Sequence, residues 1–107
     1  MADRISPRDV RARQDAGADP VVIDVRDPDQ YAAGHVAGAR NIPIAELPGK
    51  LAELGRDHQI ITYCNGGTRC ERAATLLREN GFDAQALGGG YPGWKAAGLP
   101  VEEPSKG

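Results

Sequence analysis

Cysteine and histidine are scarce in this chain, which has two residues of each among its 107. Two cysteines cannot build the dense disulfide framework of small secreted domains. Five residues separate Cys64 from Cys70, which matches neither a CxxC redox motif nor a zinc knuckle, and the two histidines lie in unrelated segments. We therefore expect no structural metal.

A large charge excess and long apolar runs are also missing. The net charge is −2 at pH 7, so nothing predicts nucleic acid or an anionic membrane surface as a partner. No apolar run approaches the roughly 20 residues of a membrane-spanning helix. The opening "MADRISPRDV" has no apolar core of the signal-peptide kind. We expect a cytoplasmic protein with no nucleic-acid or membrane partner.

Short strand-like runs alternate with helical segments along the chain. The length predicts one domain over residues 1–107, with a core at about 6–101 and a short tail at 102–107. The expected strands are the β-branched runs at 21–25 and 59–64, a weaker run at 83–87, and a brief extended piece at 41–44. The expected helices begin at Ser6-Pro7 and Asp27-Pro28 and cover 47–54, 69–80 and 92–97. This order predicts an α/β fold with a central parallel sheet and helices on both faces.

The segment "CNGGTR", Cys64 to Arg69, follows one of the strongest strand candidates. In a parallel sheet, ligands bind beyond the carboxyl ends of the strands. Gly66 and Gly67 allow unusual backbone turns and leave the loop open to a ligand. The helix that starts near Arg69 adds unpaired N–H groups and a positive dipole end, which favour a thiolate at Cys64. The loop is typical of an anion cradle around a sulfur atom, although a buried structural cysteine would fit the spacing too.

Three blocks of the sequence resemble the rhodanese, or thiosulfate sulfurtransferase, family. The loop matches its C-x-x-G-x-R motif, and "DVRDPDQYAAGHVAGARNIP" (24–43) matches its D-x-R and G-H-I-x-G-A-x-N-I-P block, with Val36 in place of isoleucine. "LGGGYPGWKAAGLPV" (87–101) is similar to its C-terminal block. The order and spacing agree from about Ser6 to Val101.

The resemblance implies a single-domain sulfurtransferase that needs no metal or organic cofactor. Cys64 would attack the outer sulfur of thiosulfate or a related persulfide donor, become a persulfide, and pass the sulfur to cyanide or a thiol. Substrate binding would fall to the loop residues Asn65, Gly66, Gly67, Thr68 and Arg69, whose N–H groups would hold the charged sulfur. The Arg69 side chain would meet the donor's sulfonate, and we expect the Thr68 hydroxyl to cap the following helix.

Three further residues are expected to support the site rather than react. Asp24 follows an apolar strand and needs partners in loop backbone or a nearby cation. Arg26 is expected to be paired or solvated, and His35 to make structural hydrogen bonds. Cys70 stands where the family usually has serine or alanine. It is either a small packed side chain or a resolving thiol for an oxidised Cys64.

Two other functions stay open for this sequence. A persulfide carrier or docking module would deliver sulfur to a protein partner, and the intact Cys64 is compatible with such a carrier. A cysteine phosphatase or arsenate reductase is less favoured. Those enzymes resemble H-C-x5-R, whereas Tyr63 precedes Cys64 here and only four residues separate Cys64 from Arg69. A tighter loop suits a sulfur atom better than a phosphoryl group.

Overall fold

A five-stranded parallel sheet forms the centre of the computed structural model, which describes residues 4–18 and 20–104. Its strand order is β1-β6-β5-β2-β4. The strands are β1 (Arg4–Ile5), β2 (Val21–Asp24), β4 (Arg40–Asn41), β5 (Ile60–Tyr63) and β6 (Ala84–Leu87). A separate antiparallel pair joins β3 (His35–Val36) to β7 (Val101–Glu102).

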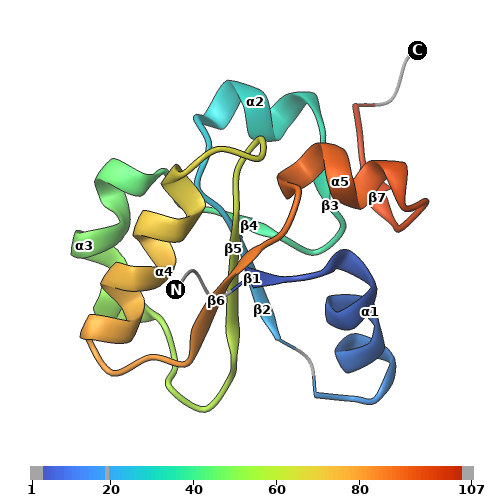
Figure 1. The fold of residues 1–107 in the computed structure, drawn as a ribbon. Helices are drawn as coiled ribbons and strands as arrows, with labels where there is room; N and C mark the ends of the chain where they lie inside the picture. Colours follow the sequence, from blue (N-terminus) through green and yellow to red (C-terminus); the bar gives the residue numbers. More distant parts are fainter. Residues whose placement is uncertain (1–3, 19, 105–107) are drawn as a thin grey trace.

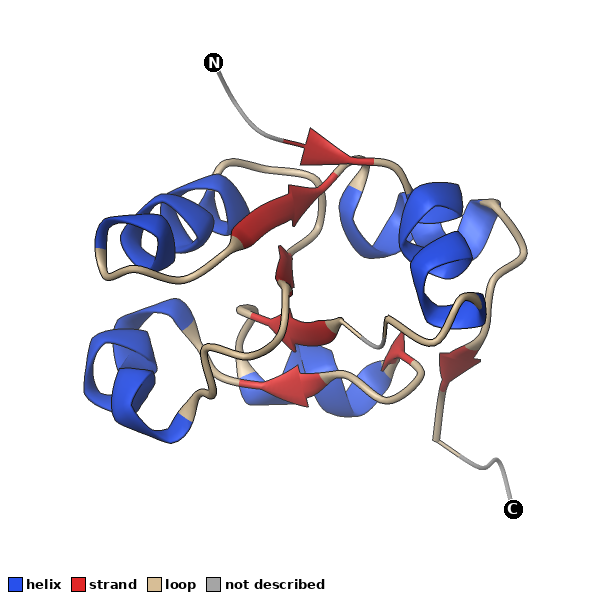
Figure 2. Cartoon of the chain, turned by 90° about the horizontal axis from the view of Figure 1, so that it is seen from below, coloured by secondary structure: helices blue, strands red, loops and turns tan. Residues whose placement is uncertain are grey.

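Helices cover both faces of this sheet, as predicted. They are α1 (Pro7–Asp15), α2 (Pro28–Ala33), α3 (Leu47–Lys50), α4 (Arg69–Glu79) and α5 (Gly90–Ala96), with 3-10 turns at Ile44–Glu46 and Leu51–Glu53. In Figure 1, α3 and α4 lie on one side of the sheet, and α1 and α5 lie on the other. Figure 2 shows the strands between these layers from below. The predicted caps form, because the Ser6 hydroxyl accepts from the Asp9 amide and Asp27 pairs with Gln30 in a capping box.

Two apolar cores fill the space between the sheet and its helices. Successive strand residues point to opposite faces, so β5 contributes to both cores. Ile60 and Cys64 belong to the core under α3 and α4, whereas Ile61 and Tyr63 belong to the core that contains Trp94 of α5. The alternation along β5 therefore directs the Cys64 side chain toward the face that α4 covers.

The sequence pattern missed the shortest strands. β1, β3 and β7 have two residues each, too few to show a periodicity. β1 pairs with β6 just ahead of the expected core, and Glu102 of the expected tail lies in β7. Residues 105–107 of that tail lie outside the described part of the chain.

Other differences concern where elements begin and end. The helix expected over 47–54 is split into α3 and a 3-10 turn, and Gly49 in its interior weakens a continuous helix. Of the brief extended piece expected at 41–44, Asn41 lies in β4, whereas Ile44 begins a 3-10 turn. The last helix starts at Gly90, two residues before the expected Pro92. None of these differences changes the sheet edge at which the cysteine loop lies.

Candidate functional site

Cys64 directly follows β5, at the carboxyl-end edge of the sheet. Tyr63 is in register with Asp24 of the neighbouring strand β2. The Val25 amide donates to the Tyr63 carbonyl at 3.0 Å, and the Tyr91 amide donates to the Cys64 carbonyl at 2.8 Å. These two hydrogen bonds hold the backbone on both sides of Cys64, so the sulfur is carried by a fixed piece of chain.

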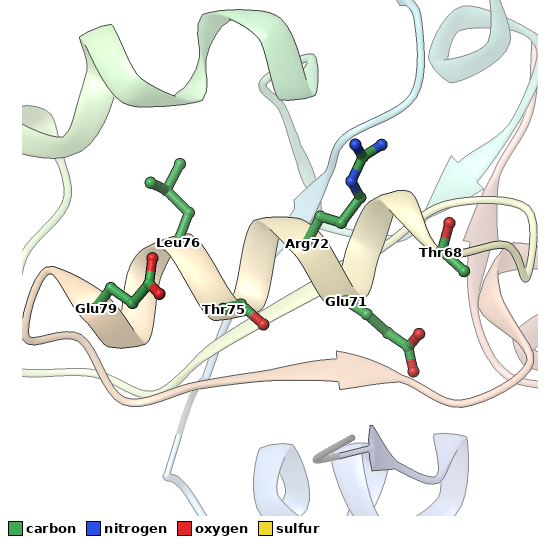
Figure 3. A pocket seen from close by; sticks show the side chains of 6 residues that line it. All are labelled: Thr68, Glu71, Arg72, Thr75, Leu76 and Glu79. Carbon is green, nitrogen blue, oxygen red and sulfur yellow. The ribbon is translucent and has the colours of Figure 1, made fainter. Parts of the chain in front are cut away.

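The thiol lies beneath its loop rather than in an open pocket. Cys64 is 1% exposed, whereas the four residues that follow it, 65–68, are exposed. A shallow cavity of about 290 Å³ runs along α4 from Thr68 to Glu79 (Figure 3), and Cys64 does not line it.

Four donors converge on the Cys64 sulfur. The Cys70 thiol donates a hydrogen bond to it, and so do the backbone N–H groups of Cys70, Gly66 and Gly67. The hydrogen bond from the Cys70 thiol is the largest cause that lowers the pKa of Cys64; burial opposes it, and the three N–H groups add to it. The pKa of Cys64 falls well below the ordinary thiol value, because neutral dipoles stabilise the thiolate inside the fold.

The same contact has the opposite effect on Cys70. Its hydrogen bond to Cys64 and its burial raise the pKa of Cys70, so this thiol stays protonated beside the Cys64 thiolate. Cys70 is fully buried in the first turn of α4. From sequence alone its role stayed open between packing and redox chemistry, and the structure makes the Cys70 thiol a hydrogen-bond donor to Cys64.

Thr68 and Arg69 lie where the loop enters α4. Thr68 occupies the N-cap, but its hydroxyl makes no cap hydrogen bond, so that prediction is wrong. Its backbone is helical, with φ −98° and ψ −10°, whereas the capping residue Ser6 has the extended conformation that aims a hydroxyl at the first turn. The half-buried Arg69 side chain makes no hydrogen bond or ion pair within residues 4–18 and 20–104, which leaves its cation available to an anion.

The glycine cluster before α5 packs directly against the cysteine loop. Gly66 has φ +94° and Gly90 has φ +58°, both in the left-handed region that favours glycine. A Cβ on Gly90 would overlap the Cys64 carbonyl oxygen and the Gly66 nitrogen. Backbone from α5 therefore supports the loop from one side, where any larger residue would displace it.

A buried ion pair occupies the neighbouring strand end. The Arg26 guanidinium bonds both carboxylate oxygens of Asp24, at distances from 2.6 to 3.0 Å, and Asp24 also accepts from the Arg26 amide. Both side chains are nearly inaccessible. Burial lowers the pKa of Arg26, but the hydrogen bonds and charge of Asp24 raise it further, so the guanidinium stays protonated.

Arg26 also connects this pair to the cysteine loop. Its guanidinium donates to the Asn65 side-chain oxygen at 3.1 Å and to the Gly34 carbonyl at 2.6 Å, and it lies 4.7 Å from the centre of the Tyr91 ring. Asp24 and Arg26 thus lie beside the loop without touching the sulfur. Although Asn65 is exposed, its side-chain oxygen accepts a hydrogen bond from Arg26 of this ion pair.

His35 lies apart from the sulfur, within the small β3–β7 pair. One ring nitrogen lies 2.9 Å from the Tyr31 carbonyl, the other lies 3.1 Å from a Glu102 carboxylate oxygen, and the ring stacks on Tyr31. Glu102 also accepts from the Gly38 amide, and these contacts lower the pKa of Glu102. The His35 side chain joins the C-terminal strand to the rest of the fold.

Residues outside the sequence-derived set complete the site. The Cys70 thiol, Gly90 and the Tyr91 amide all contact the loop or its cysteine. The six-residue step from Cys64 to Cys70, across a glycine turn, could have indicated that the two thiols meet. The role of the Tyr91 amide carries no side-chain signal, because any residue except proline supplies a backbone N–H.

The parallel sheet, the cysteine loop at its carboxyl edge and the N–H groups around the sulfur can be compared with known families. Residues 6–97 match the family described as the rhodanese-like domain, and the chain belongs to it. Within the described residues, no group of three or more His, Cys, Asp or Glu side chains could hold a metal ion.

Relatives and solved structures agree with this assignment. Thiosulfate sulfurtransferase GlpE of Stutzerimonas stutzeri is 37% identical over 93 residues, which cover 86% of this chain and 84% of that protein. A rhodanese-related protein from Thermoplasma volcanium has a TM-score of 0.84 at 32% identity, over 94% of this chain and 97% of that one. The relatives named as sulfurtransferases support a sulfurtransferase activity.

One relative is much longer than this chain. The HTH-type transcriptional regulator Rv0324 of Mycobacterium tuberculosis is 41% identical over 103 residues, which cover 94% of this chain and 45% of the regulator. The chain thus spans less than half of that protein. Of the helices in the described part of the chain, none is long and apolar enough to cross a membrane.

Proposed function

We propose that this protein moves a sulfane sulfur from thiosulfate, or a related persulfide donor, to cyanide or a thiol through a persulfide on Cys64. The observation that carries the proposal is the convergence of three backbone N–H groups and one thiol on the Cys64 sulfur. These neutral donors are suited to hold negative charge on sulfur. The arrangement is suited both to a nucleophilic thiolate and to the charged persulfide that follows.

The reaction has two displacement steps. In the first, the Cys64 thiolate attacks the outer sulfur of thiosulfate, the sulfur–sulfur bond of the donor breaks, and sulfite leaves with the bonding pair. In the second, cyanide or a thiolate attacks the outer sulfur of the persulfide, and the Cys64 thiolate is regenerated. The Arg69 cation, which has no partner among the described side chains, would bind the sulfonate oxygens of the donor.

We infer that the loop moves aside when a donor reaches the Cys64 sulfur. Cys64 is 1% exposed, and the residues above it include Gly66 and Gly67. No atom would lie within 4 Å of a Cβ on Gly67, so the outer turn of the loop has open space beside it. We infer that the donor enters there, at the exposed side of the loop, and that the outer sulfur remains at this side for the acceptor.

Intact-mass measurement after exposure to thiosulfate tests the proposal. The wild-type chain should gain the mass of one sulfur atom and lose it on addition of cyanide, while Cys64→Ser should gain none. Arg69→Ala should load only at higher thiosulfate concentration, and Arg69→Lys should fall between it and the wild type. A sulfur adduct that persists in Cys64→Ser would contradict the assignment.

The second candidate is a carrier that hands sulfur to a protein acceptor. The burial of Cys64 beneath its loop favours the carrier function, because a protein acceptor that binds the loop could move the loop aside. Single-turnover transfer from the loaded protein to cyanide, compared with transfer to a persulfide-accepting protein, separates the two functions. Fast turnover with cyanide alone would argue for the small-molecule enzyme.

A further inference from the structure

Two thiols meet inside this fold, although the proposed reaction uses only one of them. Cys64 ends β5 and Cys70 lies in the first turn of α4, and the loop between them folds back so that one thiol donates a hydrogen bond to the other. Cys64 is 1% exposed and Cys70 is 0% exposed. Both thiols are therefore shielded from small molecules in solution, and each is in contact with the other.

The backbone around Cys70 is anchored to the strand that carries Cys64. The Thr62 hydroxyl, on β5, donates to the Cys70 carbonyl at 2.7 Å. The Cys70 thiol donates to the Gly67 carbonyl oxygen at 3.5 Å and shares its hydrogen with the Cys64 sulfur. Both thiols belong to the same apolar core. The contact between the two sulfur atoms is thus built into the packing of α4 on β5.

We propose that Cys70 resolves the Cys64 persulfide: its sulfur displaces the outer sulfur as hydrogen sulfide and leaves a Cys64–Cys70 disulfide. This inference rests on the proposed function, since it begins from the persulfide. The bond between the two cysteine sulfurs forms, and the bond between the Cys64 sulfur and the outer sulfur breaks. The Cys70 proton leaves with the outer sulfur, so the products are one disulfide and one hydrogen sulfide, and no external oxidant is needed.

The contacts explain why Cys70 is inert before sulfur arrives and competent afterwards. In the resting protein the Cys70 thiol donates a hydrogen bond to the Cys64 thiolate and keeps its own proton, because the charge of Cys64 raises the pKa of Cys70. Once Cys64 carries a second sulfur, the negative charge moves to that outer atom and the Cys64 sulfur becomes an electrophile. Hydrosulfide is a better leaving group than an alkyl thiolate, because its conjugate acid is more acidic.

The resolved protein would need a dithiol reductant to return to its starting state. Such a reductant would attack the Cys64 sulfur, which lies beside the exposed loop, and release Cys70 first. With Cys70 beside Cys64, the outer sulfur of the persulfide therefore has two fates. It can be transferred to an acceptor, or it can be released as hydrogen sulfide with dithiol as the electron source.

The test follows the loaded protein under exclusion of oxygen. Wild type, Cys70→Ser and Cys70→Ala are loaded with thiosulfate, freed of excess donor, and monitored by intact mass and a sulfide electrode without added thiol. The wild type should lose the added sulfur, release one equivalent of sulfide, and end lighter than the unmodified chain by two hydrogen atoms. Both variants should keep the added sulfur, and dithiothreitol should restore the original mass of the wild type.

Peptide mapping gives a second reading that needs no variant. Trypsin cleaves after Arg69, which lies between the two cysteines, so the proposed disulfide would join two tryptic peptides that otherwise separate.

If wild type and Cys70→Ser load sulfur and keep it equally long, the inference is overturned while the proposed function stands. If no chain loads sulfur, the proposed function fails and this inference fails with it.

Discussion

Two neighbouring strand ends in this protein each hold a buried negative charge, but in different ways. At the end of β2, the Asp24 carboxylate is bound by the Arg26 guanidinium through several hydrogen bonds. At the end of β5, the Cys64 thiolate is held by N–H groups and a thiol. Both residues are almost inaccessible to solvent, at 0% and 1% exposure. Burial alone therefore does not distinguish the two sites.

The difference lies in the partner of each charge. A guanidinium in bidentate contact occupies both carboxylate oxygens and fixes the pair in place. Neutral dipoles stabilise the thiolate without neutralising it, so its electron pairs stay available to an electrophile. The two ends are also connected, since Arg26 donates to Asn65 of the cysteine loop. The ion pair is therefore in direct contact with the cysteine loop.

The largest effect is expected from breaking the supporting pair. Asp24→Ala leaves the Arg26 cation buried without its carboxylate, which should lower the free energy of unfolding by about 3–5 kcal/mol. Urea denaturation measures this loss. Asp24→Asn keeps the shape and some hydrogen bonds and should lose less. Equal stability of Asp24→Ala and the wild type would show that the pair does not hold the fold.

The next effect concerns the contact between the glycine cluster and the loop. Gly90→Ala places a Cβ against the Cys64 carbonyl and the Gly66 nitrogen, so the loop must shift and sulfur loading should fall sharply. Gly98→Ala is the matched control. Its φ of +74° carries a similar backbone cost of roughly 1–2 kcal/mol, but nothing lies within 4 Å of the new Cβ.

Activity separates the two variants better than stability does. Gly98→Ala should melt at a lower temperature and still load sulfur at the wild-type rate once folded. If both variants load sulfur equally well, the packing of α5 backbone on the loop has no role in positioning Cys64.

The pH dependence of sulfur loading tests the stabilised thiolate. Because the hydrogen bond from Cys70 and the loop amides lower the pKa of Cys64, the loading rate should stay constant as the pH falls below the ordinary thiol range. It should decline only near the depressed pKa, where the thiolate becomes protonated. Cys70→Ala removes the largest stabilising contact, so its midpoint should move to higher pH. Cys70→Ser keeps a donor and should lie between.

The same shift makes a prediction for stability. A thiol with a depressed pKa in the folded state stabilises the fold above its unfolded pKa, and this contribution is lost as the pH falls through the folded pKa. The stability difference between the wild type and Cys64→Ala should therefore shrink toward acid pH. A difference that grows toward acid pH would contradict a stabilised thiolate.

The smallest effect is expected for the link between the two strand ends. Asn65→Ala removes one side-chain hydrogen bond to Arg26, worth about 1 kcal/mol in stability. Because Asn65 belongs to the loop, we expect a modest fall in the loading rate together with this small loss of stability. Asn65→Asp keeps an acceptor for the guanidinium and should restore most of the stability. A loading rate unchanged in Asn65→Ala would show that the loop holds its shape without Arg26.

Much of this architecture follows from local signals in the chain. The β-branched runs of β2 and β5, the caps at Ser6 and Asp27, and the apolar stripe of α4 predict the elements and the parallel sheet. The shortest strands and the division of the segment after Leu47 escaped prediction, because two or four residues carry no clear periodicity. The predicted cap by the Thr68 hydroxyl is wrong for a different reason. The backbone of Thr68 is already helical, so its hydroxyl makes no hydrogen bond to the first turn of α4.

By itself the sequence determined the fold class, the family and the place of Cys64 at the end of a buried strand. It could do so because strand periodicity, helix caps and glycine turns act over a few neighbouring residues. Only the tertiary structure decided which groups surround the sulfur: the Cys70 thiol beneath it, the Gly90 backbone beside the loop, and Arg26 bound to Asn65. These contacts join segments that are separate in the chain, so they depend on how α4, α5 and β2 pack around β5.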